Sequence, residues 1–154
     1  MAAELGLPYA FASHFSPQQL KPAIRIYREH FKPSEQLDSP YVMPCVNIVA
    51  ADYDNEAEFL STSMMQMFMG VITGERKPMQ PPVDDMDRVW NMHQKMTVQQ
   101  MLACSFIGSQ KKIKQEITDF INETEANELM IASYVFNHKE RLKSHRLFAE
   151  LMTN

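Results

Sequence analysis

The chain contains the stretch Leu7-Pro8-Tyr9-Ala10-Phe11-Ala12-Ser13-His14-Phe15-Ser16-Pro17-Gln18-Gln19-Leu20-Lys21, which decides its fold class. Its first part is a short apolar run, and small and polar groups follow at residues 13–16. Ser16 is a suitable N-cap and Pro17 a suitable first helical residue, so a helix should begin here. The stretch therefore predicts a buried strand that ends in polar groups and passes directly into a helix. In α/β proteins, ligands bind at that end of the strands.

The same unit of strand and helix recurs twice, so the chain predicts strands at residues 8–12, 41–50 and 128–134. The second run is almost continuously apolar, which is typical of a strand covered on both faces in a parallel sheet. Pro44 in this run belongs near the start of the strand, at an edge or at a bulge, because it donates no hydrogen bond to a neighbour. Strands that alternate with helices predict an α/β fold with about three parallel strands, right-handed crossovers and surrounding helices.

Apolar residues at helical spacing predict helices from Pro17 to about residue 31, over 55–72 and 85–102, after Ser109, and from about residue 137 onward. We expect Pro22 to kink the first helix or delay its regular start, and an aspartate of residues 51–54 to cap the second. Residues 106–108 should be a short extended link. The proline-rich segment 74–85 should be a stiff surface loop, of the kind that forms lids or connectors. The buried stripes predicted for the second and last helices are Phe59, Leu60, Met64, Met67, Phe68 and Val71, and Leu142, Phe148, Leu151 and Met152, with His145 near the latter.

Composition limits the classes of protein to consider. The 154 residues, of which 45% are hydrophobic and 22% charged, predict a single soluble domain over residues 1–154. Apolar runs are too short to span a membrane, residues 1–6 do not resemble a secretory signal, and Cys45 and Cys104 form no CxxC pair. These features favour a cytoplasmic protein with two buried free thiols. The net charge of −4 argues against nucleic acid as a partner.

Few residues are candidates for chemistry. The sequence has no glycine-rich phosphate loop and no HExxH, and its five histidines show no metal-ligand spacing. His14 is the best single candidate because it ends a buried strand, although the pattern favours a structural histidine satisfied by the fold. Ser13, Ser133 and Tyr134 are candidates for the same reason, because they also lie at the polar ends of predicted strands. Cys45 lies inside a strand, so it is a poor nucleophile. The acidic residues 84, 85 and 87 are interpreted as part of a solvated loop. Five of the 13 methionines fall at positions 64, 65, 67, 69 and 79, and this Met-rich stretch is interpreted as core filling, with an adaptable contact surface as the alternative.

Three strands make a narrow parallel sheet with two unpaired edges, and such edges attract other chains. The sequence therefore predicts association, either as a homodimer or higher oligomer, or with another chain.

Several segments together resemble the bacterial luciferase-like flavin-dependent monooxygenases. They are Leu-Gly-Leu-Pro-Tyr-Ala-Phe-Ala-Ser-His-Phe-Ser-Pro (residues 5–17), Tyr-Val-Met-Pro-Cys-Val-Asn-Ile-Val-Ala-Ala-Asp (41–52), Gln-Pro-Pro-Val-Asp-Asp (80–85), Phe-Ile-Gly-Ser (106–109) and Glu-Leu-Met-Ile (128–131). The segments lie in collinear order along essentially the whole chain. Gln110-Lys111-Lys112 departs from the family, which usually has a proline and an acid after the serine.

The resemblance implies a partial (β/α)8 barrel, because family members are about twice this length and the strands correspond to the sixth, seventh and eighth of the barrel. Residues 1–6 then correspond to the end of the fifth helix. It also implies reduced FMN as cofactor and oxidation of a small organic substrate with O2, an aldehyde in luciferase itself. Ser13 and His14 would lie nearest the flavin. The Ser/Gly-rich turn that holds the flavin phosphate in the family belongs to the half of the barrel that has no counterpart in these 154 residues.

Two hypotheses follow. In the first, the chain is a monooxygenase subunit that is active when self-assembly or a separate N-terminal half-barrel chain rebuilds the barrel, with a flavin reductase as a further possible partner. In the second, it is a truncated, catalytically incomplete member that forms a homo-oligomer and has lost flavin binding. The open edges of the sheet favour the second hypothesis on physical grounds alone.

Overall fold

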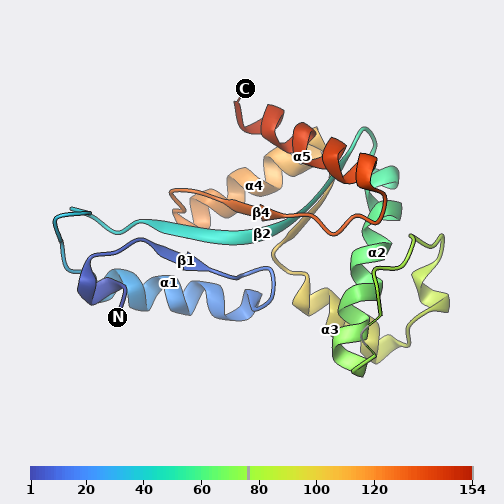
Figure 1. The fold of residues 1–154 in the computed structure, drawn as a ribbon, viewed down its shortest axis with the longest axis horizontal. Helices are drawn as coiled ribbons and strands as arrows, with labels where there is room; N and C mark the ends of the chain where they lie inside the picture. Colours follow the sequence, from blue (N-terminus) through green and yellow to red (C-terminus); the bar gives the residue numbers. More distant parts are fainter. Residues whose placement is uncertain (76, 154) are drawn as a thin grey trace.

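The computed structural model describes residues 1–75 and 77–153 and shows four parallel strands with helices around them (Figure 1). The fold class is therefore confirmed, with one strand more than predicted. The elements in chain order are η1 (Ala3–Leu5), β1 (Tyr9–Phe11), η2 (Pro17–Gln19), α1 (Leu20–Glu29), β2 (Val42–Ala51), α2 (Asp54–Thr73), η3 (Met86–Arg88), α3 (Met92–Met101), β3 (Ser105–Ser109), α4 (Gln110–Thr124), β4 (Met130–Ala132) and α5 (His138–Thr153).

The ten-residue strand β2 is the spine of the sheet, because β1, β3 and β4 all pair with it. On one side, β1 pairs with the start of β2 (Tyr9 opposite Val42) and β3 pairs with its end (Ser109 opposite Ala51). On the other side, β4 pairs with residues 45–47 in the middle of β2. The three neighbours are too short to cover both sides of β2 along its whole length.

Side chains fill the gaps that the short neighbours leave along β2. The Ser13 hydroxyl donates to the Cys45 carbonyl between β1 and β3. Beyond the end of β4, the buried Ser144 hydroxyl of α5 accepts from the Ala50 N–H at 2.9 Å. Before β4 begins, the Asn127 side chain accepts from the Val42 N–H at 2.8 Å. Each bond satisfies a backbone group that no neighbouring strand reaches.

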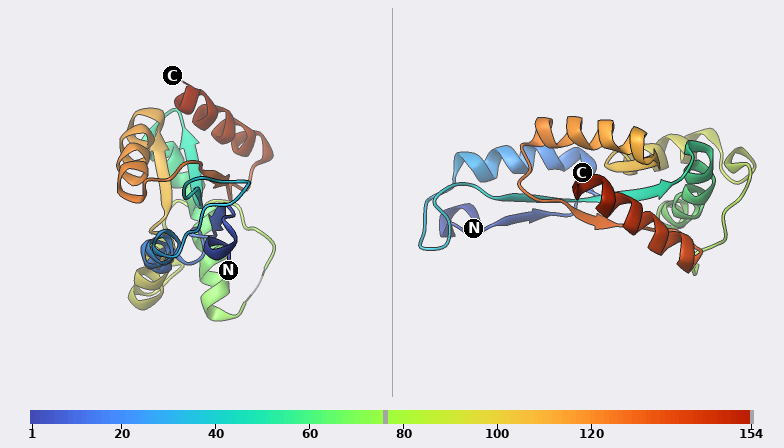
Figure 2. Two further views of the ribbon diagram at one scale, coloured as in Figure 1. Left: turned by 90° about the vertical axis from the view of Figure 1, so that its left-hand side faces the viewer. Right: turned by 90° about the horizontal axis from the view of Figure 1, so that it is seen from above.

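One face of the sheet, the outer face, is covered by α1, α4 and α5, which form an arc around the strands (Figure 2). Side chains alternate along a strand, so Val46, Ile48 and Ala50 of β2 point to this face and pack with the helices. The main helical members of this core are Leu20, Ile24, Tyr27, Ile113, Ile117, Leu147, Phe148 and Leu151.

The opposite, inner face is covered only toward the end of β2, where Val49 and Ala51 pack against α2 and α3. Further back, Ala10 of β1 is exposed and Met130 of β4 is 50% exposed. Tyr9 and Ile131, their neighbours in sequence, pack on the outer core. Part of the inner face is therefore an open apolar surface, as expected for the interior of an incomplete barrel.

The structure corrects the sequence predictions for several elements. Residues 106–108, predicted as an extended link, belong to the strand β3. The predicted helix over 85–102 divides into η3 and α3, and the strand predicted at 128–134 is reduced to β4. The 3-10 turn η2 precedes α1, so Pro22 lies in the first turn of a helix with a delayed start, as expected.

No aspartate caps α2; the Asp54 carboxylate instead accepts from the Ser109 N–H at 2.7 Å. This bond ties the start of α2 to the end of β3. Gly108 allows the close approach, because a Cβ there would lie 2.9 Å from the Asp54 oxygen.

Four residues predicted to be buried are exposed: Phe59 and Val71 of α2, and Leu142 and Met152 of α5. In both helices the apolar stripe is wider than the face that packs on the sheet.

The outer strands of the sheet have open edges. In the described residues, β1 and β4 each pair with β2 alone, so each has an open edge. None of the helices within residues 1–75 and 77–153 is long and apolar enough to cross a membrane.

Replacing Ser144 with alanine should lower the free energy of unfolding by about 1–3 kcal/mol, because it leaves the buried Ala50 N–H without a partner. Urea unfolding followed by circular dichroism measures the change. Thr118→Ala is the matched control, since its exposed hydroxyl bonds only its own helix, and it should stay within about 0.5 kcal/mol of the unchanged protein. Equal effects of the two substitutions would contradict the role assigned to Ser144.

The bond from Ser109, followed by the nearby Lys112, holds the pKa of Asp54 below its ordinary value of 3.8. Because the pKa of Asp54 is lower in the folded state than in the unfolded state, its charge stabilises the fold at any pH above the ordinary pKa. This stabilisation disappears as the pH falls through the lowered, folded-state pKa. The difference in thermal midpoint between the unchanged protein and Asp54→Asn should therefore be constant from pH 7 to about pH 5 and shrink toward pH 3. A difference independent of pH would show that the charge of Asp54 is not involved.

Candidate functional site

The register of the sheet determines where the candidate residues meet. Phe11, the last residue of β1, lies opposite Pro44, and Ala132, the last residue of β4, lies opposite Asn47. The residues that follow β1 and β4 are therefore level with the middle of β2. We call His14, Cys45, Asn47, Ser133 and Tyr134 the strand-end cluster.

Ser13 is fully buried and its hydroxyl is occupied by the bond to the Cys45 carbonyl. The same hydroxyl lies close to the Cys104 thiol, whose pKa is raised by burial against the opposing effect of Ser13. Ser13 therefore has a defined structural role in joining β1 to β2. Its predicted proximity to a flavin stays a prediction.

His14 is half-buried, and its Nδ1 atom is buried without a hydrogen-bond partner. Burial lowers the pKa of the imidazole, while the Cys45 carbonyl acts in the opposite direction. The ring packs on Phe15 with 4.1 Å between ring centroids. Burial thus disfavours the charged form of His14, and its buried Nδ1 atom has hydrogen-bonding capacity that no described residue uses. Its predicted role at a flavin site also stays a prediction.

A chain of aromatic contacts joins the ends of β1 and β4 through α2. The ring centroids of Phe15 and Phe68 are 6.2 Å apart, and those of Phe68 and Tyr134 are 6.4 Å apart with the rings edge to face. Phe68 is fully buried. The buried Phe68 ring therefore packs beside Tyr134 of the strand-end cluster, while Phe15 is 52% exposed.

Cys45 and Tyr134 lie near each other on the inner side. Burial raises the pKa of the Cys45 thiol, so it is a weak nucleophile, in line with the sequence prediction. Burial also raises the pKa of the Tyr134 hydroxyl, and charge on Cys45 would raise it further. Both groups are therefore neutral at neutral pH.

Unpaired buried polar atoms concentrate in the strand-end cluster. In the described residues these atoms are His14 Nδ1, Asn47 Oδ1, Ser63 Oγ and Ser133 Oγ. Three of the four belong to the cluster, and they come from three different segments of chain. Buried polar atoms without partners are rare and destabilising, and they often mark functional sites. The cluster therefore has hydrogen-bonding capacity that the described residues leave unused.

Asn47 was missed by the sequence predictions. It is fully buried, its Nδ2 donates to Ser105 Oγ at 3.0 Å, and it shares the inner face with Cys45 and Val49. The available signal was a lone amide within the apolar run of residues 42–51.

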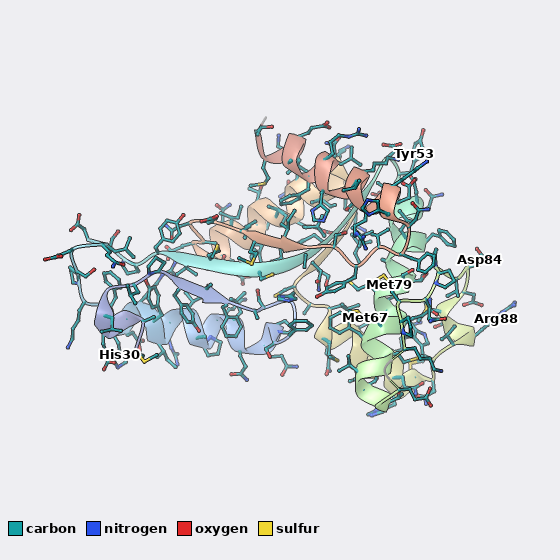
Figure 3. All side chains as sticks on the ribbon, in the orientation of Figure 1. His30, Tyr53, Met67, Met79, Asp84 and Arg88 are labelled. Atoms are coloured by element: carbon teal, nitrogen blue, oxygen red, sulfur yellow. The ribbon has the colours of Figure 1, made fainter. Side chains whose placement is uncertain are left out.

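The other motifs lie away from the cluster. Asp84, Asp85 and Asp87 are exposed, and Asp87 accepts from Trp90 and Lys95, which agrees with a solvated loop. The proline-rich loop is held along α2 by Gln66, which donates to the Pro81 carbonyl. Figure 3 places Met67, Met79, Asp84 and Arg88 at this end of the molecule and His30 at the other.

The side chains of the strand-end cluster differ in how well they suit a metal ion, the ring system of a flavin and a flavin phosphate. Within the described residues, no set of three or more His, Cys, Asp or Glu side chains is arranged to hold a metal. Aromatic rings and uncharged polar atoms fit the ring system of a flavin. No member of the cluster carries a positive charge at neutral pH, so a flavin phosphate has no counter-charge there.

Comparison with known proteins identifies relatives along nearly the whole chain. No protein-family model matches. "Luciferase-like monooxygenase" of Escherichia coli (strain K12) is 44% identical over 147 residues, which cover 96% of this chain and 44% of the relative. "Uncharacterized protein YvbT" of Bacillus subtilis (strain 168) is 40% identical over 154 residues, which cover 46% of that relative. The chain thus spans somewhat under half the length of these curated relatives.

Two solved structures have the same fold as this chain, and the match again covers somewhat under half of their length. Apo-MsnO8 matches with a TM-score of 0.80 and 26% identity, over 99% of this chain and 47% of that protein. The monooxygenase RslO1 from Streptomyces bottropensis matches with a TM-score of 0.60 and 17% identity over 43% of its length, a likeness of fold alone.

The imidazole of His14 should titrate in NMR spectra below its ordinary pKa of 6.5, because burial disfavours the charged ring. A His14→Gln spectrum assigns the resonance by its absence. Since the folded-state pKa is lowered, the contribution of His14 to stability should be present above about pH 6.5 and lost as the pH falls through the folded value. A titration above pH 6.5 would mean that an unidentified acidic partner holds the ring.

Proposed function

The chain belongs to the luciferase-like monooxygenase family, and on that premise we propose that it forms about half of a (β/α)8 barrel that uses reduced FMN and O2 to oxidise a small organic substrate. The site lies at the carboxyl ends of β1 and β4, where this kind of barrel has its active site. We also place the protein in the cytoplasm, because both cysteines are free and buried.

The observation that supports the proposal is that three unpaired buried polar atoms belong to segments that lie level with the middle of β2. His14, Asn47 and Ser133 come from three segments, and the register of the sheet brings them level. A fold that leaves several buried groups unpaired at one place is destabilised there, and a ligand that pairs with them removes the penalty.

Each part of the cluster has a distinct task in this proposal. Reduced FMN, when bound, supplies the electrons that activate oxygen. His14 presents Nδ1 as a neutral hydrogen-bonding group at the reacting centre, and Ser133 offers a hydroxyl on the opposite side of β2. Phe15, Phe68 and Tyr134 keep water away from the ring system. The flavin phosphate must be held by basic or backbone groups outside the cluster.

Completion of the barrel is part of the proposal. The open edges of β1 and β4 and the exposed inner face around Ala10 and Met130 are surfaces that the rest of a barrel would cover. The second candidate function, a non-catalytic homo-oligomer, rests on the same open surfaces, because a second copy of the chain can also cover them.

The experiment is a chimera in which this chain replaces the matching 147 residues of the Escherichia coli relative. The chimera should bind FMN and consume O2 with reduced FMN and an aliphatic aldehyde. His14→Gln should lower turnover by about tenfold or more, as expected for a group that moves or holds a proton. His30→Gln is the matched control, since this exposed histidine lies at the other end of the molecule (Figure 3).

Two results would contradict the proposal. A chimera with a cooperative unfolding transition that binds neither oxidised nor reduced FMN would support the non-catalytic alternative. A chimera in which His14→Gln and His30→Gln behave alike would remove His14 from the site.

A further inference from the structure

The amide of Asn47 is a buried polar group whose two ends have different fates. Asn47 is fully buried in β2, and its Nδ2 donates to Ser105 Oγ at 3.0 Å across the pairing of β2 with β3. Its Oδ1 is buried without a hydrogen-bond partner in the described residues. The bond to Ser105 therefore occupies the donating end of the amide, and the end that remains is an acceptor.

This acceptor restricts what can bind against it, because only an N–H or O–H group can pair with a carbonyl oxygen. The other unpaired atoms of the strand-end cluster impose no such restriction. The Ser133 hydroxyl can donate or accept, and the neutral His14 ring has two tautomers. Asn47 is thus the member of the cluster that requires a donor from the ligand.

The surroundings of Asn47 are uncharged. Ser105 lies opposite it on one side and Ala132, the last residue of β4, on the other. Its neighbours along the same face of β2 are Val49 and Cys45, and burial raises the pKa of the Cys45 thiol. An acceptor in such surroundings gains more from a hydrogen bond, and loses more without one, than it would in water.

The molecules of the proposed reaction differ in the donors they carry. O2 and an aldehyde have no N–H or O–H group. The ring system of FMN gains N–H groups when it takes up two electrons, at nitrogens that are acceptors in the oxidised ring. An acceptor held against such a nitrogen pairs with the reduced ring and repels the lone pair of the oxidised ring, so it distinguishes the two states.

We propose that Asn47 is a specificity-determining residue that selects reduced over oxidised FMN, and that Ser105 is a positioning residue that keeps Asn47 Oδ1 available to the ligand. This inference rests on the proposed function, because it assumes that the flavin ring lies in the strand-end cluster. It adds to that function a preference for one redox state, assigned to one amide.

The test titrates the full chain, alone and within the chimera with the Escherichia coli relative, with oxidised FMN and, under anaerobic conditions, with reduced FMN. Asn47→Leu keeps the branching of the side chain and removes both polar atoms. It should raise the Kd of reduced FMN by about fivefold or more, because an N–H of the reduced ring is left unpaired, and change the Kd of oxidised FMN by less than about twofold. A fivefold change in the ratio of the two constants lowers the midpoint potential of the bound flavin by about 20 mV.

Two further variants separate binding from folding. Asn122→Leu makes the same change at an exposed position of α4 and should leave both constants unchanged. Ser105→Ala keeps the amide but lets it turn, so it should reduce the preference for reduced FMN by a smaller factor than Asn47→Leu. An unchanged preference in Ser105→Ala would overturn the role of Ser105, even where Asn47→Leu does not fold.

The remaining outcomes are distinct. Equal loss of affinity for both redox states would overturn the selection, since it would place Asn47 against an N–H that both states carry or give it a structural role alone. Tighter binding of reduced FMN by Asn47→Leu would overturn it as well, because the amide would then present Nδ2. Unchanged constants in Asn47→Leu would remove Asn47 from the site. Failure of the unchanged chimera to bind FMN in either state would overturn the proposed function together with this inference.

Discussion

The structure depends on satisfying the backbone of one long strand. β2 has ten residues, nine of them buried, while its neighbours contribute segments of three to five residues. Buried N–H and C=O groups need partners. Ser13, Asn127 and Ser144 supply them from a strand end, a turn and a helix. These three side chains therefore hold segments that lie far apart in sequence in one sheet.

The uneven coverage of β2 also creates the site. Because β1 and β4 stop opposite residues 44–47, the polar residues that follow them meet the middle of β2 rather than its end. The last part of β2 pairs with β3 alone and is covered by α2, which brings Phe68 to the cluster. The same short strands leave β1 and β4 with open edges. The short length of β1 and β4 thus accounts for both the site and the open edges. A ligand at the site and a complementary part of the barrel at the edges would therefore stabilise neighbouring regions.

Sequence patterns predicted what depends on local periodicity and missed what depends on tertiary pairing. The apolar runs located β1, β2 and β4, and His14 lies in the turn that follows β1. β3 was missed because a five-residue run with a glycine is too short to distinguish a strand from a link. Asn47 was missed because one amide in an apolar run does not show which face of the sheet it occupies. Leu142 and Met152 were expected in the core because periodicity shows that a helix has an apolar stripe without showing which part of it packs.

The most direct test of this account is hydrogen exchange of the backbone amides, measured residue by residue for the isolated chain and again with the complementary part of the Escherichia coli relative. We expect β2 to exchange slowest in both cases, including the Val42 and Ala50 amides, which donate to side chains. The amides of β1 and β4 that face away from β2 should exchange fast in the isolated chain and become protected when the complementary part is added. Protection of both outer edges in the isolated monomeric chain, or fast exchange of Ala50, would contradict it.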